Sequence, residues 1–222
     1  MKDTGKVIVA LPAFNEEKHV ADVVSRAKRF ADVVVVLDDG STDGTARVAR
    51  QAGAEVIQHP TNRGYGATMQ DILSSVRGTD FNVLVTLDSD GQHYPEDIPK
   101  LVDPIQDGAD LAIGRRDGSV IPFYRRVGGT VLSVFTYILS GAKVRDSQSG
   151  FRAYSQKAVE LIKPAENGMS VCSEIIGIAS RAGLKIVEVP IDVVYLEDSS
   201  TYNPWRHGLY VLWRIIVMLT RL

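Results

Sequence analysis

Short runs dominated by apolar residues recur along the first half of the chain, with no regular alternation of polar and apolar positions inside them. They lie at 6–12, 33–40, 54–58, 81–88 and 109–114. Such runs predict strands that are buried on both faces of a parallel sheet. Segments with helix-like patterns separate them, near 16–30, 43–52, 64–77 and 95–107. This alternation predicts an α/β fold with a mostly parallel, doubly wound sheet and helices on both faces.

The pattern changes after Gly114. Residues 115–126 are rich in Arg and Gly and predict a loop, whereas 128–142 contain no charge and predict a helix with a broad apolar arc. Further helix-like stretches lie near 155–163 and 172–182, and a last strand is predicted at 184–191. We therefore expect one domain over 1–202, followed by a separate helix over 203–222.

The C-terminal segment has the pattern of an amphipathic helix. Asn203 is a suitable N-cap and Pro204 suits the first helical position. On a helical wheel Arg206, Arg214 and Arg221 fall within roughly an 80° arc, and most of the apolar residues, which include a Trp, lie elsewhere. A basic stripe beside an apolar face is typical of a helix in the bilayer interface. Packing on the sheet or on a second subunit is the alternative that the pattern leaves open.

Composition and charge narrow the class of protein. The 222 residues carry a formal net charge of -2, which argues against a general nucleic-acid-binding protein. A single cysteine, Cys172, excludes an intramolecular disulfide and fits a reducing compartment. The N-terminal residues lack the pattern of a secretory signal, and no stretch of 18 uncharged apolar residues is present. We expect a cytoplasmic protein, peripheral on the cytoplasmic face of a membrane, of undetermined oligomeric state.

Acidic residues follow two of the predicted strands. Asp38 and Asp39 end the second strand, and Asp88 and Asp90 end the fourth. In an open parallel sheet, ligands bind outside the carboxyl ends of the strands, so both clusters should face one cleft. With the amide oxygen of Gln92, Asp88 and Asp90 form an all-oxygen set suited to Mg²⁺ or Mn²⁺. Ordinary turn and capping chemistry explains either cluster alone, but explains both together poorly.

Five motifs in a fixed order resemble a known family. The segments LPAFNEE, DDGSTDGT, NRGYGAT, DSDGQH and DSQSGFRAY are similar to those of the family-2 inverting nucleotide-sugar glycosyltransferases with the GT-A fold. The combination is most similar to the branch of dolichol-phosphate mannose synthase and other polyprenyl-phosphate hexose synthases, and it covers residues 6–195. The resemblance implies transfer of a hexose from a GDP- or UDP-linked sugar to a polyprenyl or dolichyl phosphate, with Mg²⁺ or Mn²⁺.

The resemblance also implies roles for individual residues. It places the donor nucleotide against Pro12, Phe14, Glu16, Val36, Asp38, Asp88 and Ser89. It places the metal on Asp88, Asp90 and Gln92, and phosphate groups on Arg116 and Arg126. The chain departs from the family after the last strand, where members carry an Arg and a Lys that contact the diphosphate. Here Leu196 and Tyr202 lie near those places, and Arg206 and His207 lie slightly downstream as possible substitutes.

The acceptor decides whether the reaction needs a protein base. A phosphate monoester has a second pKa of about 6 and can attack as a dianion without one. An alcohol needs a positioned carboxylate or His, and Asp146 is the best candidate. Asp146 and Asp90 are thus the candidate catalytic residues, although an ion pair of Asp146 with Arg145 or Arg152 explains that acid equally well.

Three alternatives differ in class. A soluble or glycan hydroxyl acceptor keeps the donor site, and the amphipathic tail is the feature that separates it from a lipid acceptor. A non-catalytic sugar-nucleotide-binding protein would not need a complete metal set. A nucleotidyltransferase predicts a Gly-rich loop with a cation after the first strand, and residues 11–17 contain neither.

Overall fold

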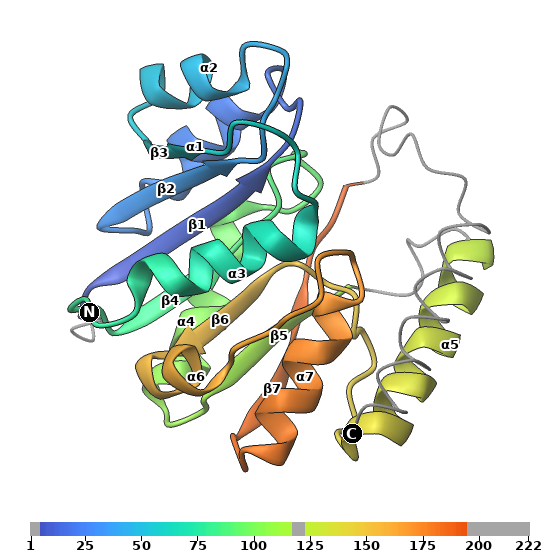
Figure 1. Ribbon diagram of the computed structural model, residues 1–222. Helices are drawn as coiled ribbons and strands as arrows, with labels where there is room; N and C mark the ends of the chain where they lie inside the picture. Colours follow the sequence, from blue (N-terminus) through green and yellow to red (C-terminus); the bar gives the residue numbers. More distant parts are fainter. Residues whose placement is uncertain (1–4, 117–122, 195–222) are drawn as a thin grey trace.

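The sheet of the protein contains every predicted strand and one that was not predicted. The computed structural model describes residues 5–116 and 123–194, with the side chains of 123–129, Val131 and Leu139 left aside. Within these ranges seven strands form one sheet in the order β3-β2-β1-β4-β6-β5-β7 (Figure 1). The strands are β1 (Val7–Ala13), β2 (Val33–Asp38), β3 (Glu55–Gln58), β4 (Val83–Thr86), β5 (Leu111–Arg116), β6 (Arg152–Ser155) and β7 (Ile186–Ile191).

Helices cover both faces of this sheet, which confirms the predicted fold class. They are α1 (Val20–Ala27), α2 (Thr45–Gln51), α3 (Tyr65–Val76), the 3₁₀ turn η1 (Pro95–Asp97), α4 (Ile98–Gln106), α5 (Phe123–Ser140), α6 (Gln156–Leu161) and α7 (Val171–Arg181). Each predicted helix within the described ranges is present, with ends shifted by a few residues. The helix predicted over 203–222 lies outside the described residues.

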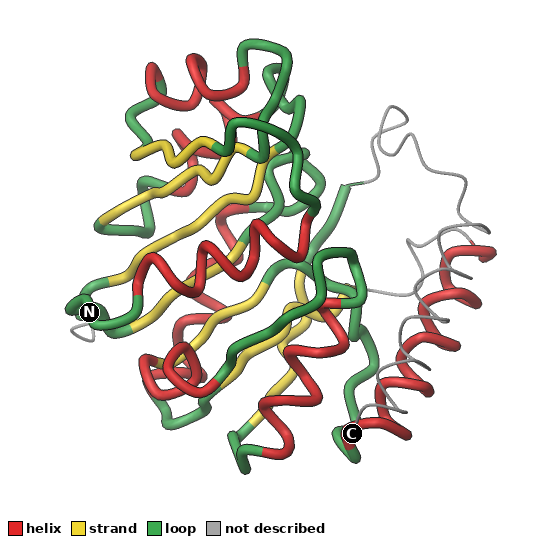
Figure 2. The backbone as a smooth tube through the Cα atoms, in the orientation of Figure 1, coloured by secondary structure: helices red, strands yellow, loops and turns green. Residues whose placement is uncertain are grey.

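Two apolar cores lie on opposite faces of the sheet because successive strand residues point to opposite sides. In β1, Val9 and Leu11 pack with α1, α2 and α4, whereas Ile8 and Ala10 pack with α3, α6 and α7. The helices α3, α6 and α7 lie in front of the sheet in the view of Figure 2. Burial on both faces explains why the strands read as apolar runs without alternation.

Strand β6 is the element that the sequence pattern did not predict. It pairs antiparallel with both β4 and β5, whereas β3, β2, β1 and β4 are mutually parallel. It is four residues long and begins with Arg152, which is 1% exposed. A short strand that starts with a buried cation carries no apolar periodicity. It inserts the segment after DSQSG between β4 and β5, and so brings that segment next to the acids that follow β4.

Helix α5 lies outside the helices that cover the two faces of the sheet, and it packs against α7 (Figure 1). The contact is made partly through hydroxyl groups, since the Thr136 Oγ1 donates to Ser173 Oγ at 2.9 Å. The Ser133 Oγ ties α5 instead to the segment that follows it, by donating to the Arg145 carbonyl at 2.9 Å. On its other side Val134, Tyr137 and Ile138 are 50%, 44% and 61% exposed. None of the helices in the described ranges combines the length and the apolar character needed to cross a membrane.

Candidate active site

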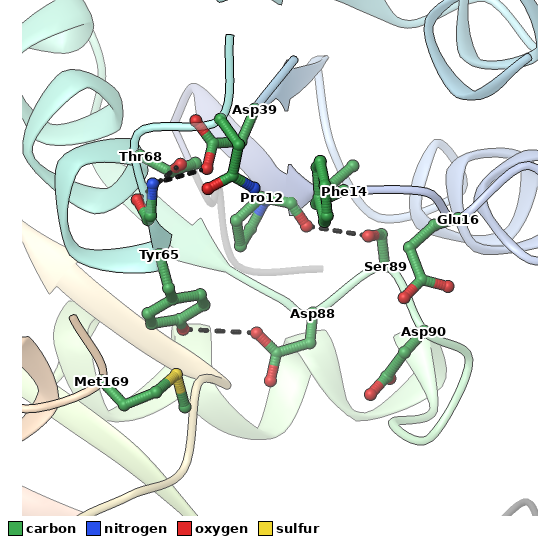
Figure 3. A pocket seen from close by; sticks show the side chains of 13 residues that line it. Pro12, Phe14, Glu16, Asp39, Tyr65, Thr68, Asp88, Ser89, Asp90 and Met169 are labelled. Atoms are coloured by element: carbon green, nitrogen blue, oxygen red, sulfur yellow. Dashed lines mark hydrogen bonds between the residues drawn. The ribbon is translucent and has the colours of Figure 1, made fainter. Parts of the chain in front are cut away.

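A cleft of about 350 Å³ opens at the carboxyl ends of β1, β2 and β4, beside the start of α3. This is the edge of the sheet where the sequence predicted a ligand site. Its lining comes from five separate segments of the chain (Figure 3). The lining residues are Pro12, Ala13, Phe14, Glu16, Asp39, Asn62, Gly64, Tyr65, Thr68, Asp88, Ser89, Asp90 and Met169.

The loop after β1 is tied to the loop after β2. Asn15 adopts a positive φ of 57°, which is uncommon for a residue with a side chain. Its backbone N–H donates to Ser41 Oγ at 2.8 Å, and its Oδ1 accepts from the Thr42 N–H at 2.9 Å. The Glu16 N–H donates to Thr45 Oγ1 at 2.8 Å. These bonds hold Phe14, which is 43% exposed, and Glu16 at the mouth of the cleft.

Asp39 holds the opposite wall. Its Oδ1 accepts from the Arg63 N–H at 2.9 Å and its Oδ2 from the Gly64 N–H at 2.8 Å. The Nδ1 of His59 lies 2.7 Å from Oδ1, and the Nε2 of His59 lies 2.9 Å from Asp71 Oδ2. The buried Asp39 carboxylate therefore sets the position of the loop that leads into α3.

The acids after β4 lie at the bottom of the cleft. The Tyr65 hydroxyl donates to Asp88 Oδ1 at 3.3 Å, and the Nε2 of His93 lies 3.7 Å from Asp88 Oδ2. The carboxylate of Asp90 accepts from the backbone N–H and from the side-chain amide of Gln92, at 2.9 and 2.6 Å. Gln92 thus contacts Asp90 directly. The Ser89 hydroxyl donates to the Pro12 carbonyl at 2.8 Å, which joins this loop to β1.

Carboxylates in the cleft are costly to ionise. Burial, followed by the charges of Asp90, Asp43 and Asp88, raises the pKa of Glu16 to about 7. Burial also raises the pKa of Asp88, and burial together with the charge of Asp88 raises the pKa of Asp90. Burial lowers the pKa of His93 to about 4, so this imidazole is neutral near pH 7 and adds no positive charge. The cleft therefore favours a ligand that brings positive charge or hydrogen-bond donors.

The donor set fits a hard divalent cation. Asp88 and Asp90 offer carboxylate oxygens, the ligands that Mg²⁺ and Mn²⁺ prefer. In the described part of the chain, no group of three His, Cys, Asp or Glu side chains is arranged to hold a metal ion. Mg²⁺ is commonly held by one or two carboxylates together with substrate phosphates and water, and two carboxylates meet that need.

The predicted nucleotide residues divide into two groups. Five line the cleft, beside the predicted metal ligand Asp90: Pro12, Phe14, Glu16, Asp88 and Ser89. Val36 and Asp38 do not, because both are fully buried, and Val36 belongs to the core that faces α1. The Oδ1 of Asp38 accepts from the Ser41 N–H at 3.0 Å. Its neighbour Asp39 is the acid from DDGSTDGT that reaches the cleft.

Arg116 and Asp146 form an ion pair. The Arg116 Nε lies 2.7 Å from Asp146 Oδ2, and its Nη2 lies 2.8 Å from Oδ1. Burial alone would raise the pKa of Asp146, but the hydrogen bonds and charge of Arg116 outweigh it and lower that pKa. The alternative explanation of Asp146, an ion pair with Arg145 or Arg152, therefore named the wrong partner, which is Arg116.

The side chain of Arg152 forms hydrogen bonds with backbone carbonyls instead. It donates to the carbonyls of Ser149, Cys172 and Ser147 at 2.8, 3.1 and 2.8 Å. Arg126 lies in α5 and its side chain is outside the described part of the chain, as are Leu196, Tyr202, Arg206 and His207.

Comparison with known proteins identifies the family. The model of glycosyl transferase family 2 matches residues 8–162, which is more than half of the 222 residues. The chain belongs to glycosyl transferase family 2. The family and fold implied by the motifs are confirmed, and the protein is a glycosyltransferase.

Two curated relatives act on lipid phosphates. The UDP-N-acetylglucosamine–dolichyl-phosphate N-acetylglucosaminyltransferase of Methanococcus voltae is 32% identical, over 87% of this chain and 87% of the relative. The polyprenol monophosphomannose synthase of Mycolicibacterium smegmatis is 31% identical, over 86% of this chain and 78% of the relative.

The solved structures give the same fold. Glucosyl-3-phosphoglycerate synthase of Mycobacterium tuberculosis, in complex with Mn²⁺, UDP and phosphoglyceric acid, has a TM-score of 0.73 and 26% identity. The alignment covers 94% of this chain and 76% of that one.

Several residues of this glycosyltransferase's cleft were not assigned from the sequence. They are Ala13, Asn62, Gly64, Tyr65, Thr68 and Met169, whereas Asp39 was expected to face the cleft but was given no role there. The motif NRGYGAT contains the middle four, and its position just before a predicted helix was a usable signal, since the start of such a helix lies at the ligand edge of the sheet. Met169 follows no motif, and only the packing of the loop before α7 against α3 brings it to the cleft.

Proposed function

We propose that this glycosyltransferase transfers a hexose from a UDP- or GDP-linked sugar to a polyprenyl or dolichyl phosphate, with inversion at the anomeric carbon. The observation that carries the proposal is the contrast between two sets of acids. Asp88 and Asp90 lie in the cleft with raised pKa values, whereas Asp146 is already neutralised by Arg116.

The first set suits the donor. Mg²⁺ or Mn²⁺ held by Asp88 and Asp90 would neutralise the diphosphate leaving group. Phe14 offers an exposed aromatic face to a base at the cleft mouth. Gln92 stays a predicted metal-side residue, and its hydrogen bonds to Asp90 make it a group that orients that carboxylate. Val36 and Asp38 stay predicted nucleoside residues, behind the wall that Asp39 forms.

The second set suits a phosphate acceptor. A general base must be free to accept a proton, and a carboxylate in a bidentate pair with arginine is a poor base because its pKa is lowered. A phosphate dianion needs no such base. One of its oxygens forms the new bond to the anomeric carbon as the bond to the diphosphate breaks on the opposite face. The task of the protein is then alignment and charge stabilisation, by Arg116 and by the predicted Arg126.

A membrane surface is the expected site of action, since the acceptor is a lipid. The exposed residues Val134, Tyr137 and Ile138 on α5 form an apolar surface that could enter the interface. The proposal includes the predicted interfacial helix over 203–222 and a peripheral location of the protein on the cytoplasmic face of a membrane.

The test uses the purified full chain, with UDP- and GDP-linked glucose, mannose and N-acetylglucosamine as donors. Each donor is offered to a short polyprenyl phosphate and to the corresponding alcohol, with Mn²⁺ or with EDTA. We expect transfer to the phosphate, dependence on the metal, and inverted product stereochemistry by NMR. Preference for the alcohol would refute the phosphate mechanism and make Asp146 the residue to test as base. Full activity in EDTA would refute the metal site.

A further inference from the structure

Gly150 lies directly against the carboxylate of Asp88. A Cβ atom on Gly150 would overlap Asp88 Oδ2 and would lie 2.5 Å from Oδ1 and 2.7 Å from Cγ. Such distances are below any contact that real Cβ atoms make. Gly150 is not among the glycines of the described chain that have a positive φ. The glycine is therefore required by the space that the Asp88 carboxylate occupies, and not by its own backbone conformation.

The backbone at Gly150 is held in place on both sides. The Thr86 hydroxyl donates to the Gly150 carbonyl at 2.9 Å in a buried bond. On the preceding residue, the Arg152 Nε donates to the Ser149 carbonyl at 2.8 Å. On the following residue, the Phe151 carbonyl accepts from the Gly114 N–H at 2.8 Å. Because these bonds belong to the β4–β6–β5 part of the sheet, this backbone cannot retreat without breaking them.

The Asp88 carboxylate, by contrast, is the end of a short side chain that can rotate. The Tyr65 hydroxyl contacts its Oδ1 at 3.3 Å. The carboxylate is thus held between a hydroxyl from α3 and the bare Cα of Gly150.

We infer that Gly150 is a positioning residue of the donor site, whose missing side chain lets the Asp88 carboxylate take the orientation in which it meets the divalent cation. The inference rests on the proposed function, because it gives Asp88 its role at the metal. It assigns to the Gly of the DSQSG segment a task that turn geometry does not explain. Adding one methyl group there should displace one carboxylate and leave the fold intact.

The experiment compares Gly150→Ala with Gly177→Ala. The second is a matched control, because a Cβ on Gly177 in α7 meets only Arg181 Nη1, at an ordinary 3.8 Å. For each protein we would measure the thermal unfolding midpoint without metal, the binding of Mn²⁺ in the presence of UDP by electron paramagnetic resonance, and the binding of UDP in EDTA. We expect Gly150→Ala to weaken Mn²⁺ binding by roughly 10- to 100-fold, as loss of an orienting partner does. Its unfolding midpoint and its UDP binding in EDTA should stay close to those of Gly177→Ala.

A double-mutant cycle with Asp88→Ala isolates the contact. Without the Asp88 carboxylate the three atoms nearest to the added methyl group are gone, so Gly150→Ala should change neither Mn²⁺ binding nor stability in that background. If Gly150→Ala alone fails to fold, the double variant should fold, since it removes the clash. A double variant that also fails to fold would overturn the inference, because the backbone would then be the obstacle.

Failure of the inference and failure of the proposed function give different results. If Asp88→Ala weakens Mn²⁺ binding and Gly150→Ala does not, the metal site stands and the positioning role of Gly150 is refuted. If wild type does not bind Mn²⁺ with UDP, or Asp88→Ala has no effect on it, the metal role of Asp88 is refuted and the inference falls with it.

Discussion

The cleft that follows β4 and the neighbouring Asp146–Arg116 pair both bury carboxylates, but with opposite electrostatic results. In the cleft, burial raises the pKa values of Glu16, Asp88 and Asp90, and the charges of neighbouring acids raise those of Glu16 and Asp90 further. Beside it, Arg116 forms a bidentate pair that lowers the pKa of Asp146. A cationic ligand would reduce the electrostatic cost of ionising the carboxylates in the cleft. In the Asp146–Arg116 pair the two opposite charges already balance before any ligand binds.

This difference indicates how the two substrates would be handled. A donor site with excess negative charge binds a nucleotide diphosphate more tightly with a cation than without one, so metal and nucleotide should bind cooperatively. The Asp146–Arg116 pair needs no added cation, because its charges already balance. The predictions below, from the largest expected effect to the smallest, test whether the two regions differ in this way.

Asp90→Asn should have the largest effect. It removes a charge from the predicted metal site while keeping the shape of the side chain, and a metal contributes several kcal/mol to stabilising a leaving group. We expect a fall in turnover of about 100-fold or more and loss of the metal dependence of UDP binding. Asp192→Asn, at an acid that is 77% exposed, is the control. Near wild-type turnover with Mn²⁺ would show that the metal assignment is wrong.

Asp39→Asn should weaken nucleotide binding. Both Asp39 oxygens accept backbone N–H groups, from Arg63 and Gly64, so the new NH₂ group would face a donor. An unsatisfied buried donor costs about 1–3 kcal/mol, which corresponds to a rise of roughly 10- to 100-fold in KM for the sugar nucleotide. Asp71 contacts the other ring nitrogen of His59 and is more exposed than Asp39, so Asp71→Asn should raise the KM for the sugar nucleotide less. An equal KM in the two variants would contradict the role of Asp39 in shaping the wall.

Asp146→Asn should reduce turnover by less than about 10-fold with a polyprenyl phosphate acceptor, since the phosphate dianion needs no base. A general base contributes roughly 10²- to 10⁴-fold. The measurement is turnover at saturating donor and acceptor. A fall in turnover of the size expected for a lost general base would mean that Asp146 takes a proton from the acceptor, and so takes part in the reaction together with the residues of the cleft.

Glu16→Gln should raise stability slightly and only above acidic pH. The pKa of Glu16 is about 7 in the folded protein against 4.5 for an unperturbed Glu, so the folded state binds more protons between these values. Stability is therefore lost as pH rises through this window, and the neutral Gln avoids the loss. After allowance for solvent screening, we expect a gain of about 1 kcal/mol at about pH 8 and little at about pH 5. Urea unfolding at the two pH values measures it, and a gain at low pH instead would contradict the assigned shift.

The metal provides a control for this last prediction. In wild type, Mn²⁺ with UDP should raise the unfolding midpoint more at about pH 8 than at about pH 5, because bound cation relieves the repulsion that ionised carboxylates create.

Much of the fold and part of the cleft could be predicted from local pattern. The buried strands read as apolar runs because both faces of the sheet are covered, and the acids that end β2 and β4 were placed at the ligand edge by the parallel topology. The wall made by Asp39, Asn62 and Gly64 could not be predicted with the same rules. Whether Asp38 or Asp39 enters the cleft depends on where the strand ends and how the next loop turns, and a shift of one residue reverses the direction of a side chain.

The sequence by itself determined the order of the described helices and of six of the seven described strands, the family, and the two acidic segments, because contiguous residues carry each of these signals. Tertiary structure alone decided the pairing of Asp146 with Arg116, the insertion of β6 between β4 and β5, and the contact of Gly150 with Asp88. These contacts join residues 30 or more positions apart, so no local periodicity encodes them. They arise from the close packing of a folded interior, where the space left by one missing side chain determines where another can lie.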